Sequence, residues 1–126
     1  MKFFELFQNW ENLEEHNAQS VIFSAGEPTD VLYFIISGEV ELTLNGEALG
    51  IECAGGIIGE MAMVPSAAQS ATATTLGATR LARIDRDQLK EIASANAEFS
   101  LHVMSVLAKR LRAVNQYIST HIEQTG

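Results

Sequence analysis

The segment from Gly59 to Met63 has the residue pattern best suited to binding a small anion. It reads Gly-Glu-Met-Ala-Met, and we expect residues 60–63 to form one short helical turn. A glycine at position 59 permits unusual dihedral angles and a close approach of the backbone. The first amides of a helical turn lack partners within the turn, so they would point toward a negatively charged group. The sequence therefore predicts a binding site for an anionic ligand.

Residues that could perform enzymatic chemistry are few and scattered. The histidines are His16, His102 and His121, and all three lie outside the segment expected to form strands. Jelly-roll metalloenzymes need clustered histidines and carboxylates on barrel strands, so we expect no metal and no other cofactor. Cys53 has no base nearby in sequence and is expected to be a small buried apolar residue. A single carboxylate, Glu60, makes no acid–base pair, so we predict no catalytic residue and no enzyme.

Charge is distributed unevenly along the 126 residues. The formal net charge is −8, and residues 3–79 contain no Lys or Arg. Such an acidic surface would repel a phosphate backbone, so we expect no direct nucleic-acid binding. Lys109, Arg110 and Arg112 form the one basic cluster, which is typical of a solvated helix face. Four residues follow Ile122, so any DNA contact is expected to come from a partner.

Hydropathy and the N-terminal sequence predict a cytoplasmic protein that makes no membrane contact. The longest apolar run, residues 31–36, is far too short to span a bilayer. The first residues lack the cleavage site of a signal peptide, because Glu5 interrupts the apolar stretch and no small-residue motif follows.

Alternating polar and apolar residues predict several short strands between residues 18 and 84. The clearest alternation covers residues 39–44, and Asn45-Gly46 follows it directly. Asn-Gly after such a run is the strongest short hairpin signal, because both turn residues need positive φ. Gly50 is among the residues expected to end strands. The other strand candidates are residues 19–23, 31–37, 47–49, 70–76 and 79–84. This spacing indicates one mainly β domain, a closed sandwich or jelly roll.

Helices are predicted on both sides of the strands. Apolar residues spaced three and four apart predict a short amphipathic helix over residues 3–15. Asp85 and Gln88 form a capping-box pattern that opens a short helix through Ala93. Asn96 is the expected N-cap of a long helix ending at Ile122, so the C-terminal helices cover about residues 85–122.

The long helix has two apolar flanks. The flank with heptad-like spacing comprises Met104, Leu107, Leu111, Val114 and Ile118. The neighbouring flank comprises Phe99, Val103, Val106, Ala113 and Tyr117. A helix about 40 Å long exceeds what a small barrel can cover, so we expect one flank to pack on the barrel and the other on a second copy. The alternative is a helix that lies wholly on its own barrel.

Two segments resemble the cyclic-nucleotide-binding domains of the bacterial catabolite activator and of the regulatory subunit of protein kinase A. Residues 23–40 resemble the first barrel strands of these domains, and residues 55–71 resemble their phosphate-binding cassette. The resemblance extends over about residues 18–122. It implies a double-stranded β-helix, or jelly-roll barrel, over residues 18–84, with a short N-terminal helix and a long C-terminal dimerisation helix. It also implies a regulatory module that binds cyclic AMP or cyclic GMP and signals through that helix to a partner protein.

The resemblance assigns roles to individual residues of the cassette. Glu60 would accept a ribose hydroxyl, and the amides of Met61 and Ala62 would meet the cyclic phosphate. A polar residue of the long helix touches the base in the resembled domains, and Asn115 falls near that position. Asn115 could instead be a polar residue of the dimer seam. The ligand-binding residues implied are Gly59, Glu60, Met61, Ala62, Gln69, Ser70, Ala71 and Asn115.

One position departs from the resembled pattern. Ser70 and Ala71 match, but Gln69 stands where the resembled domains have an arginine that pairs with the phosphate. Glutamine donates hydrogen bonds without charge, so we predict weak binding. Arg80 and Arg83 are the next cations along the chain, and we expect both to face solvent. Two functions therefore remain open: a cyclic-nucleotide sensor, and a degenerate barrel that serves as a dimerisation or protein-interaction module.

Overall fold

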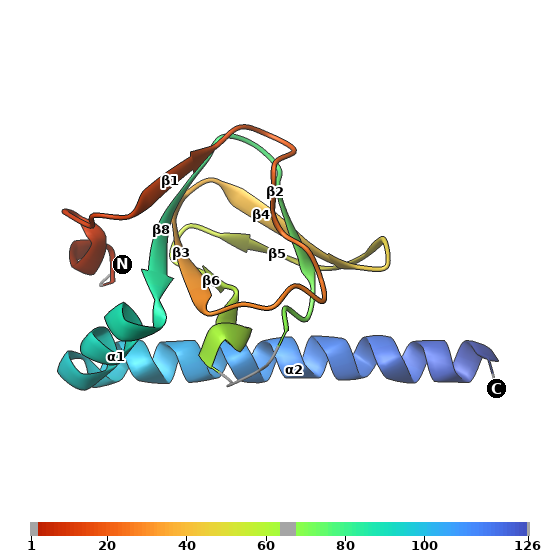
Figure 1. Ribbon diagram of the computed structural model, residues 1–126. Helices are drawn as coiled ribbons and strands as arrows, with labels where there is room; N and C mark the ends of the chain where they lie inside the picture. The colour runs from red at the N-terminus through yellow and green to blue at the C-terminus, as the bar shows by residue number, and fades with distance from the viewer. Residues whose placement is uncertain (1–2, 64–67, 126) are drawn as a thin grey trace.

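Two four-stranded antiparallel sheets face each other in the computed structural model, which describes residues 3–63 and 68–125 (Figure 1). One sheet has the strand order β1-β8-β3-β6, and the other has the order β2-β7-β4-β5. The strands are β1 (Leu13–His16), β2 (Val21–Phe23), β3 (Val31–Ser37), β4 (Glu39–Leu44), β5 (Glu47–Cys53), β6 (Ile57–Ile58), β7 (Thr72–Thr75) and β8 (Thr79–Asp85). The predicted mainly β, jelly-roll architecture is confirmed.

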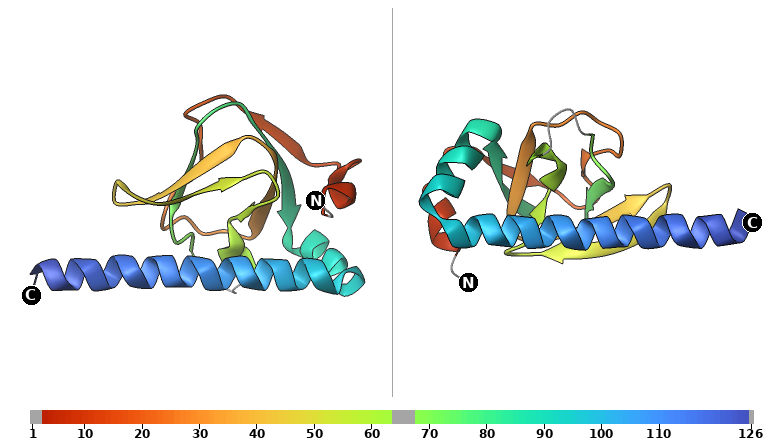
Figure 2. Two further views of the ribbon diagram at one scale, coloured as in Figure 1. Left: turned by 180° about the vertical axis from the view of Figure 1, so that it is seen from behind. Right: turned by 90° about the horizontal axis from the view of Figure 1, so that it is seen from below.

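A long helix runs beneath the barrel, and its C-terminal part extends beyond it (Figure 2). The helices are η1 (Phe4–Phe7) and η2 (Glu60–Met63), both of 3-10 type, followed by α1 (Arg86–Ala95) and α2 (Ala97–Thr125). The Asp85 carboxylate accepts from the Gln88 amide at 2.8 Å, and the Gln88 side chain accepts from the Asp85 amide at 3.0 Å. The Asn96 side chain likewise accepts from the Phe99 amide. Both predicted helix starts are confirmed.

The β4–β5 hairpin forms at the predicted turn but runs further than predicted. Asn45 and Gly46 both have positive φ, 51° and 83°. β5 continues through Gly50 to Cys53, so the prediction of a strand break at Gly50 is wrong. Leu42 pairs with Gly50 and Thr43 with Ala48, which leaves one extra residue on β5. The glycine therefore marks a β-bulge rather than a strand end.

The N-terminal segment differs from the predicted helix over residues 3–15. Only Phe4–Phe7 is helical, and Leu13–His16 is a strand that pairs with β8. The apolar spacing of this segment correctly indicates which side chains are buried, because Phe3 and Phe7 pack in the cluster beside α2. The backbone from Leu13 onward pairs with β8, which gives it more hydrogen bonds than a short isolated helix would. As a result His16 lies on a barrel strand, contrary to the sequence prediction.

Two apolar clusters hold the barrel and helices together. The barrel interior is filled by Phe23, Ile35, Val40, Leu42, Ile58, Ala71, Ala73 and Leu81. The second cluster lies between the β1-β8-β3-β6 sheet and the helices, and it includes Leu32, Phe34, Ile57, Ile84, Phe99, Val103 and Val106. One flank of α2 thus packs on the barrel as predicted, through buried Phe99, Val103 and Val106.

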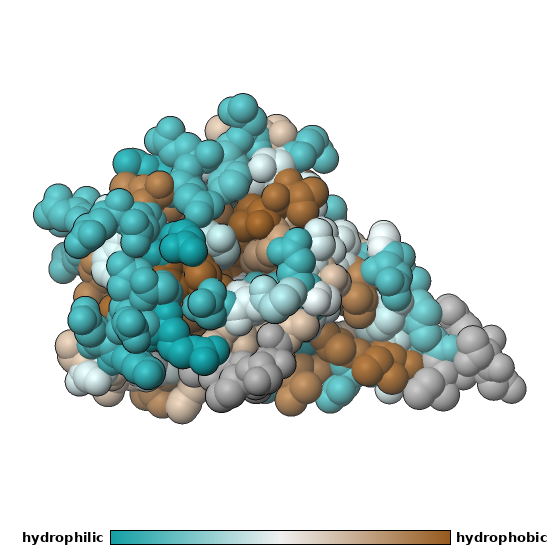
Figure 3. Space-filling view, in the orientation of Figure 1, coloured by the Kyte–Doolittle hydropathy of each residue, from teal (hydrophilic) through white to brown (hydrophobic). Residues whose placement is uncertain are grey.

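The other flank of α2 is uncovered in the single chain. Met104, Leu111 and Ile118 are 49%, 60% and 46% exposed. Figure 3 shows apolar surface along the C-terminal half of this helix. Cys53 is also exposed, contrary to its predicted burial, because β5 is an edge strand of its sheet.

Candidate functional site

Gly59 holds the strand β6 and the turn η2 in close contact with β3. Its φ is +76°, and an added Cβ would lie 3.0 Å from the Val31 carbonyl oxygen and 3.3 Å from the Gln69 Nε2. A side chain is therefore disfavoured both by the backbone conformation and by space. Residues Glu60–Met63 form the predicted turn, and within it the Ala62 amide donates to the Gly59 carbonyl at 3.1 Å. The Ala62 amide, which was expected to meet a phosphate, therefore already donates a hydrogen bond within the turn.

The turn is anchored from the C-terminal helices by two arginines. Arg86 at the start of α1 donates from Nη2 to the Ala62 carbonyl at 2.8 Å. Arg110 of α2 donates from Nε to Oε1 of Glu60 at 2.8 Å. Glu60 and Arg110 are 3% and 4% exposed, so this ion pair is buried. The expectation that Arg110 lies on a solvated helix face is wrong.

A second acid, Glu52, also contacts Arg110. Oε1 of Glu52, on β5, lies 3.5 Å from Nη2 of Arg110 and 3.2 Å from Nζ of Lys109. The Glu52 side chain is 12% exposed, whereas that of Lys109 is 66% exposed. Two carboxylates and two cations thus connect β5, η2 and α2. The network fixes the helix against the edge of the cassette.

Gln69, to which the resemblance assigns the phosphate-pairing position, lies beside Gly59. It is 5% exposed. Its backbone amide donates to the Glu27 carbonyl at 2.9 Å, and its backbone carbonyl accepts from the Gly26 amide at 2.8 Å. Ala71 is buried in the barrel interior, while Ser70 is half-buried. The structure therefore gathers the glycine, the acid and the glutamine of the cassette at one place.

Other predicted positions do not join this group. Arg80 and Arg83 are exposed side chains of β8 that lie 3.8 Å from Glu15 and Glu14, as expected for groups directed away from the cassette. Asn115 is exposed on α2, on the same flank as Leu111 and Ile118. Its position belongs to the uncovered helix flank, and not to the flank that packs on the barrel.

Sequence reasoning missed both arginines that anchor η2. Arg110 follows Glu60 by 50 residues, and only the fold brings them together. One available signal was the helical spacing of Val103, Val106 and Arg110, which places the arginine on the flank that packs on the barrel.

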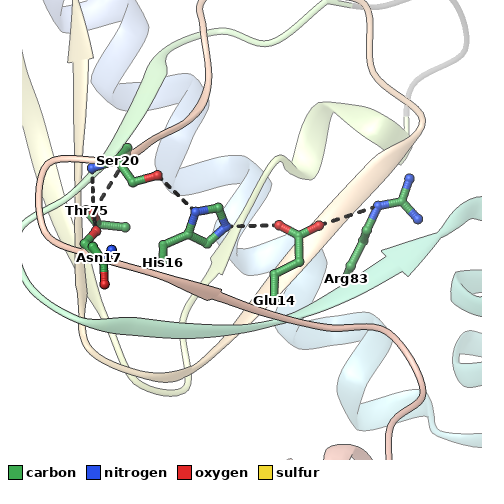
Figure 4. Close-up of polar contacts among 6 residues, drawn as sticks. All are labelled: Glu14, His16, Asn17, Ser20, Thr75 and Arg83. Carbon is green, nitrogen blue, oxygen red and sulfur yellow. Dashed lines mark hydrogen bonds and ion pairs between the residues drawn. The ribbon is translucent and has the colours of Figure 1, made fainter.

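A second polar cluster links β1, the following loop and β8 (Figure 4). His16 contacts Glu14 at 3.0 Å through Nε2 and Ser20 at 2.9 Å through Nδ1, and Glu14 also lies 3.8 Å from Arg83. Burial raises the pKa of the nearby Tyr33 hydroxyl, the Glu14 carboxylate adds to that rise, and Arg83 opposes it.

The order carboxylate, imidazole and hydroxyl is that of a nucleophilic triad. However, the Ser20 amide donates to the Thr75 hydroxyl at 2.8 Å and the Gln19 amide to the Thr75 carbonyl at 2.9 Å. Both amides that could form an oxyanion hole are therefore occupied. The cluster joins the β1–β2 loop to β7.

Residues 3–63 and 68–125 contain no group of three or more His, Cys, Asp or Glu side chains arranged to hold a metal ion. His102 is stacked on Phe3, and its Nε2 lies 3.1 Å from the Gly55 carbonyl oxygen. Within the same residues, no helix is both long and apolar enough to cross a bilayer.

Residues 13–96 match the cyclic nucleotide-binding domain family. The CRP-like cAMP-activated global transcriptional regulator of Mycobacterium tuberculosis is 32% identical over 103 residues, which cover 78% of this chain and 46% of the regulator. The chain thus spans about half the length of that relative.

Solved structures show the same architecture. An EAL enzyme in its cGMP-bound form superposes with a TM-score of 0.61 at 33% identity, over 80% of this chain and 28% of that one. A global regulator of Xanthomonas campestris, described as responsive to c-di-GMP, superposes with a TM-score of 0.72 at 25% identity, over 91% and 61% of the two chains.

Proposed function

The chain belongs to the cyclic nucleotide-binding domain family, and we propose that it is a regulatory module that binds one cyclic nucleotide weakly, between η2 and α2. The single observation that carries this proposal is the buried Glu60–Arg110 pair beside Gly59 and Gln69. The relatives named as cAMP-activated and cGMP-bound make cyclic AMP and cyclic GMP the first ligands to test.

Each residue of the pocket has a role in this proposal. Glu60 uses Oε1 for Arg110, and a carboxylate has further acceptor sites, so it can also accept a ribose hydroxyl. Gln69 and Ser70 offer neutral hydrogen bonds to the phosphate, and the amide of Met61 adds another. Ala62 and Ala71 are buried beside these groups, and their small side chains leave the polar groups free of steric cover.

Weak binding follows from the distribution of charge. A phosphate that enters the site loses hydrogen bonds to water, and the neutral side chain of Gln69 offers no charge-assisted hydrogen bond in their place. Such a bond is worth about 1.5–3 kcal/mol, roughly tenfold to a hundredfold in affinity. Arg110 supplies a buried cation, but Glu60 and Glu52 already hold it. We therefore expect a dissociation constant for cyclic AMP on the order of 100 micromolar or poorer.

The output of the module is its long helix. Arg110 and Leu111 are neighbours on α2, so one residue contacts the cassette while the next lies on the exposed apolar flank. We propose that two copies pair through this flank, with Asn115 in the seam, and that ligand binding shifts the helix and so changes how the dimer meets a partner protein. In this proposal the protein is cytoplasmic and not an enzyme, and it contacts neither nucleic acid nor a membrane directly.

A second function is favoured by the same departure at position 69. If the internal ion pairs of Arg110 are permanent, the pocket holds no ligand and the domain serves as a dimerisation or protein-interaction module. The uncharged Gln69 is the observation in its favour.

Calorimetric titration at low salt separates the two functions. Cyclic AMP and cyclic GMP are titrated into the unmodified protein and into Gln69→Arg. Gln8→Arg is the control, because Gln8 is exposed and lies outside the cassette segment. The proposed function predicts that Gln69→Arg binds at least about tenfold tighter and that Gln8→Arg does not. Absence of binding even by Gln69→Arg would favour the interaction module.

A further inference from the structure

Two carboxylates contact the buried guanidinium of Arg110, whose single charge one carboxylate would neutralise. Glu60 alone neutralises Arg110, through a short Nε–Oε1 contact of 2.8 Å. Glu52 is the surplus acid, and it lies on the Nη2 side of the same guanidinium. We propose that Glu52 is a built-in competitor, whose carboxylate occupies the guanidinium where an anionic ligand would pair. This inference rests on the proposed function.

The distances indicate that the competing contact is the weaker one. Charge-assisted N–H···O bonds are usually 2.7–2.9 Å long. The Arg110–Glu60 contact lies in that range, whereas the Arg110–Glu52 contact is 3.5 Å long. A phosphate oxygen can therefore replace Glu52 without disturbing the Glu60 pair.

Glu52 also has a second partner that can retain it. Nζ of Lys109 lies 3.2 Å from the same Oε1 of Glu52, and the lysine side chain is 66% exposed. A carboxylate displaced from Arg110 can move with Lys109 toward solvent. The displacement therefore leaves no unpaired buried charge.

The backbone around Glu52 keeps the competitor in place when the pocket is empty. Glu52 pairs with Val40 in the hairpin. Its Oε2 lies 2.8 Å from where a Cβ on Gly56 would stand, so the carboxylate lies against the turn that leads into β6. A Cβ at position 56 would crowd both this carboxylate and the Cys53 carbonyl oxygen, which lies 3.0 Å from that point.

The test is a calorimetric titration of cyclic AMP into the unmodified protein, Glu52→Gln and Glu39→Gln. Glutamine keeps the size of glutamate and removes the charge. Glu39 lies on the paired strand β4, opposite Cys53, and serves as the matched control for net charge. We expect Glu52→Gln to bind at least about tenfold tighter and Glu39→Gln to change affinity by less than about twofold. Glu52→Thr, which suits a strand, replaces Glu52→Gln if the latter does not fold.

The outcomes separate this inference from the proposed function. Measurable binding by the unmodified protein with equal or weaker binding by Glu52→Gln would overturn the inference, since Glu52 would then position Arg110, and would leave the proposed function intact. Equal tightening by both variants would overturn it too, as a general charge effect. Binding by Glu52→Gln alone would support it. Absence of binding by all three proteins would overturn the inference together with the proposed function.

Discussion

Replacing Arg110 with methionine tests whether the Glu60–Arg110 pair holds α2 against the cassette. Methionine keeps much of the apolar stem of arginine and removes its charge. The change leaves the Glu60 carboxylate, 3% exposed, without its closest cation. Breaking a buried pair by removing one partner typically costs about 3–5 kcal/mol. Glu52 loses one cation but keeps Lys109, so it adds little to that figure.

Urea unfolding followed by circular dichroism measures the effect. We expect Arg110→Met to lower the free energy of unfolding by about 3 kcal/mol or more. Arg112→Met is the matched control, because Arg112 is exposed on the same helix, and it should change stability by no more than about 0.5 kcal/mol.

A double-mutant cycle then isolates the pair. Glu60→Gln removes the buried charge that Arg110→Met leaves unpaired, so the double variant should be more stable than the sum of the single effects predicts, by about 1–3 kcal/mol. A loss for Arg110→Met as small as that of the Arg112→Met control would refute the reasoning. In that case Glu60 would have to be solvated and α2 would not be docked at the cassette.

Three further predictions concern the seam, a turn and pH. Leu111→Glu places a charge in the seam of both chains, so light scattering at tens of micromolar should show a monomer where the unmodified protein is a dimer; a monomeric unmodified protein would contradict the proposed seam. Gly38→Ala should lower the free energy of unfolding in urea by about 2 kcal/mol or more, because φ is +97° and the new Cβ would lie 2.5 Å from Oγ1 of Thr79. Gly26 also has positive φ, but no atom lies within 4 Å of its added Cβ, so Gly26→Ala should lower it by only about 1 kcal/mol. The pKa of Tyr33 is raised in the folded state, so the unfolded chain loses the hydroxyl proton at a lower pH than the folded chain does. The free energy of unfolding should therefore fall as pH rises past about 10. Tyr33→Phe should weaken that fall, and an identical pH profile for the variant would contradict the prediction.

Local signals in the sequence predicted most of the fold. Asn45-Gly46, the Asp85 capping box and Asn96 each act through hydrogen bonds or dihedral angles of neighbouring residues, so their outcome depends little on distant contacts. The segment around Leu13 was predicted wrongly because its pairing with β8 involves residues about 70 positions away. Apolar spacing reported that its side chains are buried, and it could not report which strand pairs with its backbone.

The site was predictable in part for the same reason. Gly59 and the η2 turn follow from a contiguous motif, and the structure places Gln69 beside them. The pairing of Arg110 with Glu60 could not be predicted from neighbouring residues, because the two side chains are 50 residues apart and lie on different helices. Residues 3–79 contain no Lys or Arg, whereas the fold brings Arg110 of α2 against Glu60.

Titration of cyclic AMP into the isotopically labelled protein, followed by amide NMR, tests the central claim most directly. The claim is that a cyclic nucleotide binds weakly between η2 and α2. It predicts that the amides of residues 59–62 and of Arg110 shift together and saturate with a dissociation constant on the order of 100 micromolar or poorer. Submicromolar binding would contradict the argument from Gln69, and the absence of any saturable shift at those amides would contradict binding itself.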